Sequence, residues 1–250
     1  MGSLFSGVGG LDLGLERAGM EIVWQVENDP FRQAVLAKHW PEVKRYGDIR
    51  TIDPAELEPV ELVAGGPPCQ PVSVAGKQRG AQDERWLWPE MARIIAVLHP
   101  QWIIMENVTG LLKWGFGIVL RDLAAFGYDA EWAVLSAEEF GYPHRRERIF
   151  IVAYPKGFGC QSDEFKPIIF NENLYRTTQD KANEWQVARG CSGRILRVPN
   201  SRICRVANGV PDRMDRYGSL GDAVIPEIAE AIGKTIILYS CPDKRCKNGV

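Results

Sequence analysis

Several features that would place this chain in a membrane or a secretory pathway are missing from its sequence. No apolar run approaches the ~20 residues that a membrane-spanning helix needs. The opening Met-Gly-Ser-Leu-Phe lacks the basic-then-apolar pattern of a secretory signal. The six cysteines show no paired framework for a chain of 250 residues, which favours a reducing compartment. We therefore expect a cytoplasmic protein with no membrane partner.

A metal-ligand pattern and a strong net charge are also absent. Cys241 and Cys246 lie near the C-terminus, but no second ligand pair with zinc-site spacing accompanies them, so we predict no metal. The formal net charge is −2, yet residues 155–216 hold eleven Lys/Arg and seven Asp/Glu, a net +4 that leaves −6 elsewhere. This basic segment fits a polyanion bound on one side, although a solvated surface explains it equally well.

Strand-like and helix-like stretches alternate over residues 1–154. We expect strands at residues 4–5, 21–26, 62–64, 102–105, 128–135 and 148–154, and helices at 11–18, 30–40, 89–98 and 118–126. This rhythm predicts an α/β fold with an open, mostly parallel, doubly wound sheet. Residues 155–212 have no sustained period and predict a small irregular module. Residues 213–240 regain a helical pattern and should pack back onto the first domain.

One cysteine lies on a stiff turn after a predicted buried strand. Residues 65–71 read Gly-Gly-Pro-Pro-Cys-Gln-Pro and follow the short apolar stretch 61–64. Each proline fixes its own φ and keeps the preceding residue out of the helical region. Cys69 is thus held at the carboxyl end of a strand, where ligands bind in α/β sheets. We favour a nucleophile over a structural cysteine, which would more often lie among apolar neighbours.

Three further features suggest a cofactor that contains adenosine. Residues 5–10, Phe-Ser-Gly-Val-Gly-Gly, join the first strand to a helix, and such a glycine-rich turn allows a ligand close to the backbone. Glu27 follows about 20 residues later, where an acid can accept hydrogen bonds from ribose hydroxyls. Asp48 lies after the third strand-like stretch and can accept from an adenine amino group. A lone acid after a strand is otherwise commonly just solvated.

Charged residues also flank two later strands. Glu106 follows the strand at 102–105 and should lie near Cys69 if the two strands are neighbours; otherwise it would cap the next helix. Arg146 and Arg148 should share one face of a strand by alternation and could hold a carboxylate or phosphate. An ordinary surface charge cluster is the other interpretation.

Taken together, these motifs resemble those of the C5-cytosine DNA methyltransferases. They are, in order, residues 5–10, Glu27, Asp48, Pro67-Pro68-Cys69-Gln70, Glu106-Asn107-Val108, Arg146-x-Arg148 and the closing Gly221-Asp222-Ala223-Val224. The resemblance implies a Rossmann-like class I methyltransferase sheet with helices on both faces and a small irregular target-recognition region. Asp222 departs from the family, which usually has asparagine there.

The resemblance also implies a role for each residue. Cys69 would attack C6 of a flipped-out cytosine, Glu106 would bind N3, and Arg148, with Arg146 nearby, would steady the base. S-adenosyl-L-methionine, leaving as S-adenosyl-L-homocysteine, would be held by Phe5, Ser6, Gly7, Gly9, Gly10, Leu11, Glu27, Asn28, Asp48, Ile49, Pro67, Leu87, Asp222 and Val224. A loop that closes on DNA would contribute Gln70, Ser73, Lys77, Arg79 and Arg85.

The expected activity is therefore that of a DNA (cytosine-5-)-methyltransferase acting on double-stranded DNA as a monomer. Its setting would be a bacterial or phage modification system, in which a cognate restriction endonuclease can accompany it. Two alternatives remain open: an RNA cytosine-5 methyltransferase, and a catalytically silent DNA-binding paralogue. The Cys-Phe-Thr tripeptide of the tRNA-modifying branch is absent, which weighs against the RNA enzyme.

Overall fold

The computed structural model describes residues 1–68, 86–142, 144–158, 167–171, 174 and 223–240, and the backbone of 185–189 and 195–199. Several predicted site residues lie outside these ranges, namely Cys69, Gln70, Ser73, Lys77, Arg79, Arg85 and Asp222. Within the described part, no helix is both long and apolar enough to cross a bilayer. The same part holds no group of three or more metal-ligating side chains.

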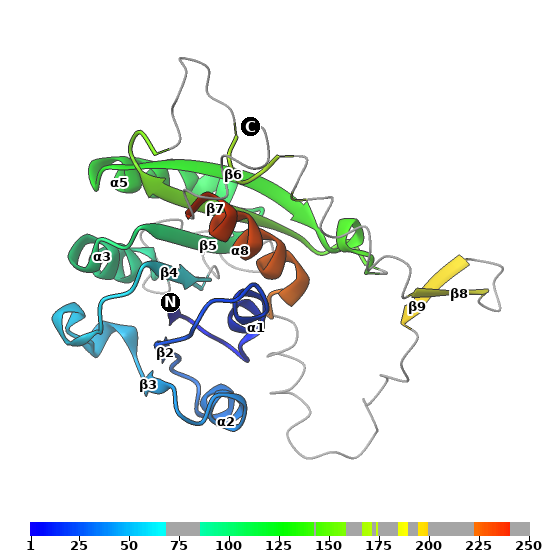
Figure 1. Cartoon of the computed structure of the whole chain (residues 1–250), viewed down its shortest axis with the longest axis horizontal. Coiled ribbons are helices and arrows are strands. Elements are labelled where there is room, and N and C mark those ends of the chain that lie inside the picture. Colours follow the sequence, from blue (N-terminus) through cyan, green and yellow to red (C-terminus); the bar gives the residue numbers. More distant parts are fainter. Residues whose placement is uncertain are drawn as a thin grey trace.

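A seven-stranded sheet with the order β3-β2-β1-β4-β5-β7-β6 forms the centre of the molecule (Figure 1). Its strands are β1 (Gly2–Leu4), β2 (Trp24–Val26), β3 (Lys44–Tyr46), β4 (Leu62–Gly65), β5 (Trp102–Val108), β6 (Tyr128–Ser136) and β7 (Glu147–Pro155). β7 runs antiparallel to both of its neighbours, and the other pairings are parallel. The predicted open, mostly parallel α/β sheet is confirmed.

Helices cover both faces of the sheet, as predicted, and each face has its own apolar core (Figure 1). The helices are α1 (Gly10–Arg17), α2 (Pro30–His39), α3 (Trp88–Leu98), α4 (Leu111–Trp114), α5 (Phe116–Ala125) and α8 (Pro226–Ser240). On one face α1 and α8 contribute Leu15 and Ile232, and on the other α3 and α5 contribute Ile95 and Leu123. Because successive side chains of a strand point to opposite faces of the sheet, the same strands contribute residues to both cores.

Three short 3₁₀ helices and a hairpin complete the described elements. The 3₁₀ helices are η1 (Ile49–Thr51), η2 (Pro54–Glu56) and η4 (Ala137–Phe140). The strands β8 (Trp185–Arg189) and β9 (Ile195–Pro199) pair antiparallel in a separate two-stranded sheet. The hairpin lies within residues 155–212, for which the sequence predicted a small irregular module and no particular strand.

Local sequence explains where several elements begin and end. α2 starts at Pro30 because Asp29 accepts a hydrogen bond from the Arg32 amide and proline suits the first helical turn. β5 continues beyond the predicted end at residue 105 and includes Glu106. The alternative role of Glu106 as a helix cap is therefore wrong: the residue before α4 is Gly110, and no side chain caps that helix.

Glycines bring α1 and α8 into backbone contact. A Cβ atom on Gly14 would overlap the carbonyl oxygen of Pro226 and lie 2.5 Å from the Cβ of Ala229. A Cβ on Gly233, from the α8 side, would lie 2.7 Å from the Cβ of Ala18. These distances are shorter than van der Waals contact, so the two helices require glycine at both positions.

We predict that Gly14→Ala lowers the free energy of unfolding by about 1–3 kcal/mol, because α8 must move away from α1. Urea unfolding followed by circular dichroism measures this loss. Gly117→Ala is the matched control, since a Cβ there meets nothing within 4 Å and alanine favours the helix by up to about 1 kcal/mol. Equal stability of Gly14→Ala and the unsubstituted chain would contradict the close packing.

Candidate active site

One pocket of about 310 Å³ lies at the carboxyl ends of the parallel strands, where α/β sheets bind ligands. Its volume falls within the range of small-molecule sites, roughly 300–1,000 Å³. The predicted site residues in its lining are Phe5, Ser6, Gly7, Gly10, Leu11, Glu27, Asn28, Asp48, Ile49, Pro67, Leu87, Glu106, Arg148 and Val224. The structure thus brings together residues from eight segments of the chain.

The glycine-rich loop after β1 forms one wall of the pocket through unusual backbone angles. Phe5 has a φ of 54°, a left-handed conformation that is uncommon outside glycine. Gly9, at the start of α1, has a φ of 84°, and a Cβ there would overlap the ring of Trp40. A Cβ on Gly10 would overlap the carbonyl oxygen of Val224. The loop therefore packs tightly against both α2 and the segment before α8.

Glu27 ties this loop to the turn after β2. One carboxylate oxygen accepts a hydrogen bond from the Gly7 amide at 2.7 Å, and the other accepts from the Asp29 amide at 2.8 Å. Only 8% of the residue is exposed. Because each carboxylate oxygen has about two acceptor positions, both can still accept a hydroxyl. Glu27 thus shapes the loop while its carboxylate faces the pocket.

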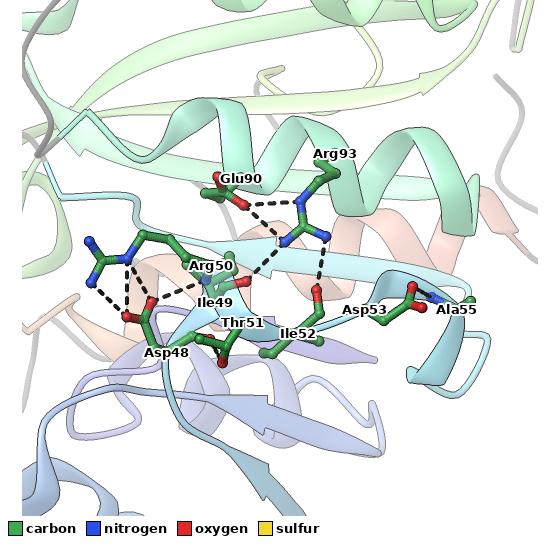
Figure 2. Close-up of polar contacts among 9 residues, drawn as sticks. All are labelled: Asp48, Ile49, Arg50, Thr51, Ile52, Asp53, Ala55, Glu90 and Arg93. Atoms are coloured by element: carbon green, nitrogen blue, oxygen red, sulfur yellow. Dashed lines mark hydrogen bonds and ion pairs between the residues drawn. The ribbon is translucent and has the colours of Figure 1, made fainter.

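Asp48 begins the 3₁₀ helix η1, and Arg50 engages its carboxylate (Figure 2). One oxygen accepts from the Arg50 amide at 3.0 Å and from Nε at 2.9 Å, and the other accepts from Nη2 at 2.6 Å. These hydrogen bonds hold the pKa of Asp48 below its usual value. The sequence pattern predicted an acceptor here but not the arginine beside it.

Glu106 and Arg148 form an ion pair across the antiparallel strands β5 and β7. Arg148 lies opposite Val108 in the register, which places its side chain diagonally beside Glu106. The Arg148 Nε lies 3.0 Å from the Glu106 Oε1, and the side chains are only 21% and 10% exposed. A Cβ on Gly66 would lie 3.0 Å from the Glu106 Oε2. The pair therefore lies against the turn that leads to Cys69.

Asn107 fixes the backbone of that turn. Its side-chain amide donates a hydrogen bond to the carbonyl oxygen of Pro67 at 3.2 Å, and the asparagine is 2% exposed. Its side-chain oxygen accepts from the Val108 amide at 2.9 Å. The motif Glu-Asn-Val was recognised in the sequence, but the asparagine was given no role of its own.

Two described residues of the predicted site are not in the pocket lining. Gly9 packs on Trp40 instead, and Arg146 lies one residue before the start of β7 at Glu147. The Arg146 carbonyl oxygen accepts a hydrogen bond from the Ala137 amide at 3.2 Å, and Arg146 and Arg148 are both half-buried while Arg145 and Glu147 are exposed, in line with the predicted alternation. A catalytic role for Arg146 stays a prediction, as does every role assigned to residues outside the described part. The lining also contains Arg32, Arg50, Gly66, Asn107 and Ala223, which were not predicted.

A buried carboxylate beneath the glycine-rich loop escaped the sequence pattern. Asp12 in α1 is fully buried and accepts hydrogen bonds from Ser3 Oγ and Gln25 Nε2, both at 3.0 Å. Ser6 Oγ donates to Ser3 Oγ at 2.8 Å, so the network reaches the loop itself. Burial raises the pKa of Asp12 to about 6, although the two hydrogen bonds oppose the shift.

Comparisons with known proteins identify relatives of this chain. The family model for C-5 cytosine-specific DNA methylases matches residues 1–201. The chain is 34% identical over 249 residues to the type II methyltransferase M.AquIA of Picosynechococcus sp., covering 86% of this chain and 97% of that protein. A solved structure of a DNA modification methyltransferase encoded within an E. coli prophage has a TM-score of 0.53 and 27% identity, covering 62% of this chain and 46% of that one.

Other relatives are considerably longer than this chain. The type II methyltransferase M.NgoBI of Neisseria gonorrhoeae is 38% identical over 174 residues, which cover 66% of this chain and 55% of that protein. The chain therefore spans nearly all of M.AquIA but about half the length of M.NgoBI.

We predict that Asp12→Asn changes how stability depends on pH. Because the folded pKa of about 6 exceeds the ordinary aspartate pKa of 3.8, the folded state binds the proton more tightly. The stabilisation that comes from proton binding at Asp12 is greatest below about pH 4 and is lost as the pH rises through 6. Relative to the unsubstituted chain, the asparagine variant should gain about 2–3 kcal/mol between pH 4 and 7. Urea unfolding across this range measures the difference.

Gly117→Ala provides the control for that experiment. It adds and removes no ionisable group, and its Cβ meets nothing within 4 Å, so the shape of the stability curve should stay as it is in the unsubstituted chain. Parallel curves for Asp12→Asn and the unsubstituted chain would refute a raised pKa at Asp12.

Proposed function

Because the chain belongs to the C-5 cytosine-specific DNA methylase family, we propose that it transfers a methyl group from S-adenosyl-L-methionine to C5 of cytosine in duplex DNA. One observation carries the proposal. The Glu106–Arg148 ion pair lies in the same pocket as the glycine-rich loop and Glu27, and against the turn that leads to Cys69. A base-binding pair, a nucleotide-binding wall and a cysteine on a rigid turn are the groups that this reaction needs.

The pocket fits the cofactor at each of its parts. The glycine-rich loop offers close backbone approach, and Glu27 has acceptor positions for ribose hydroxyls. Asp48 and Ile49 would hold the adenine, while Pro67, Leu87 and Val224 complete the wall. When bound, S-adenosyl-L-methionine supplies the methyl group on a positively charged sulfur. The residues around it exclude water and hold it beside the base.

Covalent catalysis overcomes the poor nucleophilicity of cytosine C5. The thiolate of Cys69 forms a bond to C6 of the base, and the electron pair displaced from the C5–C6 double bond makes C5 enamine-like. Glu106 gives a proton to N3, which neutralises the charge that develops on the ring. After C5 has gained the methyl group, a water molecule takes the C5 proton, the double bond re-forms as the Cys69–C6 bond breaks to release the thiolate, and N3 returns its proton to Glu106. The base must first leave the duplex, because C6 is inaccessible within the stack.

Arg148 and Asn107 support these steps in different ways. Arg148 supplies a positive charge beside Glu106 and would hold the base against it. Asn107 holds the Pro67 carbonyl, so the proline turn keeps a constant position relative to Glu106. Arg148 would thus act on the base, and Asn107 on the turn that precedes the nucleophile.

The remaining residues of the proposed site would bind DNA. Gln70, Ser73, Lys77, Arg79 and Arg85 would close over the duplex as a loop, and the basic residues 155–212 would recognise the target sequence. A monomer is sufficient for this arrangement, and a restriction endonuclease would recognise the same DNA sequence. These assignments rest on the family resemblance.

We expect the purified chain to transfer labelled methyl groups from S-adenosyl-L-methionine to cytosine in a duplex DNA library. Cys69→Ser should abolish transfer and also the covalent trapping of 5-fluorocytosine DNA, because a hydroxyl is a far weaker nucleophile. Scintillation counting and denaturing gels provide the two measurements. A trapped adduct in the serine variant would refute the assigned nucleophile, and no transfer to any library would refute the activity.

We predict that Glu106→Gln lowers kcat by roughly 10²–10⁴-fold, because an amide cannot give the proton to N3. Binding of S-adenosyl-L-homocysteine should stay nearly unchanged, which titration calorimetry can check. Glu138→Gln is the matched control: Glu138 also pairs with an arginine, Arg145 at 3.0 Å, but its side chain is 57% exposed. Comparable losses in both variants would mean that Glu106 serves folding rather than chemistry.

A further inference from the structure

Arg93, on the outer side of the α3 helix, holds the turn that carries Asp48 and Ile49 (Figure 2). Its Nη2 donates to the carbonyl oxygen of Ile49 and its Nη1 to that of Ile52, both at 2.9 Å. Its Nε donates to Glu90 Oε2 at 3.0 Å, one turn earlier in the same helix. The planar guanidinium thus joins two carbonyls of one turn to a core helix.

The turn has little other support from regular structure. β3, which precedes it, is an edge strand of three residues that pairs only with β2 among the described strands. Within η1, the Ile52 amide reaches the Ile49 carbonyl at 3.4 Å, a long hydrogen bond. By contrast, α3 is anchored by Met91, Ile94 and Ile95, which are fully buried. Ile49 and Ile52 are buried in the same apolar core as α3, and Arg93 adds a polar connection between this turn and the helix.

The same helix also begins at the pocket. Leu87, the residue before α3, lines the pocket together with Asp48 and Ile49. The α3 helix therefore fixes the position of Leu87 in the pocket wall and, through Arg93, the position of the turn that carries Asp48. A ligand amino group that donates to Asp48 needs a constant distance between Asp48 and Leu87, because hydrogen bonds weaken steeply when their geometry changes.

We propose that Arg93 is a positioning residue for adenine recognition: it fixes the Asp48–Ile52 turn so that Asp48 can accept the exocyclic amino group of the cofactor in place of the exposed Arg50 side chain. The inference rests on the proposed function, since it takes the pocket to hold S-adenosyl-L-methionine. It adds a residue outside the pocket lining that determines selectivity for a 6-amino purine over one lacking that group.

The test compares two ligands on the full chain by titration calorimetry. They are S-adenosyl-L-homocysteine and its analogue with an unsubstituted purine in place of adenine. Arg93→Met keeps the aliphatic stem but removes both hydrogen bonds to the turn. We expect it to weaken binding of S-adenosyl-L-homocysteine by roughly tenfold or more, because charge-assisted hydrogen bonds are lost. The purine analogue should lose much less affinity, so selectivity for the amino group falls.

Companion variants separate positioning from folding. Glu90→Gln keeps both carbonyl contacts and should retain the selectivity, whereas Arg93→Lys, with one ammonium group, should restore part of it. In an Asp48→Ala background, Arg93→Met should cause no further loss of selectivity, because the acceptor is already gone. In steady-state assays, KM for S-adenosyl-L-methionine should rise more than kcat falls.

Each adverse outcome has a distinct meaning. Equal loss of affinity for both ligands in Arg93→Met would show a general structural role and overturn the inference. Unchanged selectivity in that variant would overturn it as well. An unsubstituted chain that binds S-adenosyl-L-homocysteine but ignores the amino group would refute adenine recognition by Asp48 alone. An unsubstituted chain that binds neither ligand would refute the proposed function itself.

Discussion

The antiparallel pairing of β7 between β5 and β6 decides where the reactive side chains meet. In a wholly parallel sheet the beginning of β7 would lie at the amino edge, far from the ends of β4 and β5. Because β7 is reversed, its first residues reach the carboxyl edge, and Arg148 comes to lie beside Glu106. The glycine-rich loop, Glu106 and the turn before Cys69 already meet at the ends of parallel strands, and the reversal of β7 adds Arg148 to them.

Close backbone contacts are the second requirement of the site. Gly10 touches the segment around Val224, Gly14 touches α8, and Gly66 touches the Glu106 carboxylate. At each of these positions a Cβ would have to displace a neighbour. The C-terminal helix is therefore part of the pocket's construction, since residues 223–224 supply the surface against which the glycine-rich loop is packed.

The sequence predicted those parts of the fold and site that depend on local pattern. Glu27 and Asp48 could be placed because an acid after a strand in an α/β sheet has a known position, and both line the pocket. Arg93 and Asp12 could not be placed, because their partners are backbone carbonyls or buried side chains from distant segments. Tertiary contacts, rather than local sequence propensity, determine where such residues lie and which partners they have.

The exposed pair between Asp48 and Arg50 links the pocket to the salt content of the surrounding solution. Dissolved ions weaken an exposed ion pair, and 58% of the Arg50 side chain is open to solvent. As ionic strength rises, the Asp48 carboxylate would therefore become more accessible to a nucleotide that competes with Arg50 for it. Contacts with DNA phosphates weaken under the same conditions. Rising salt would then favour binding of the nucleotide and weaken binding of DNA. An intermediate ionic strength would therefore best support the binding of both.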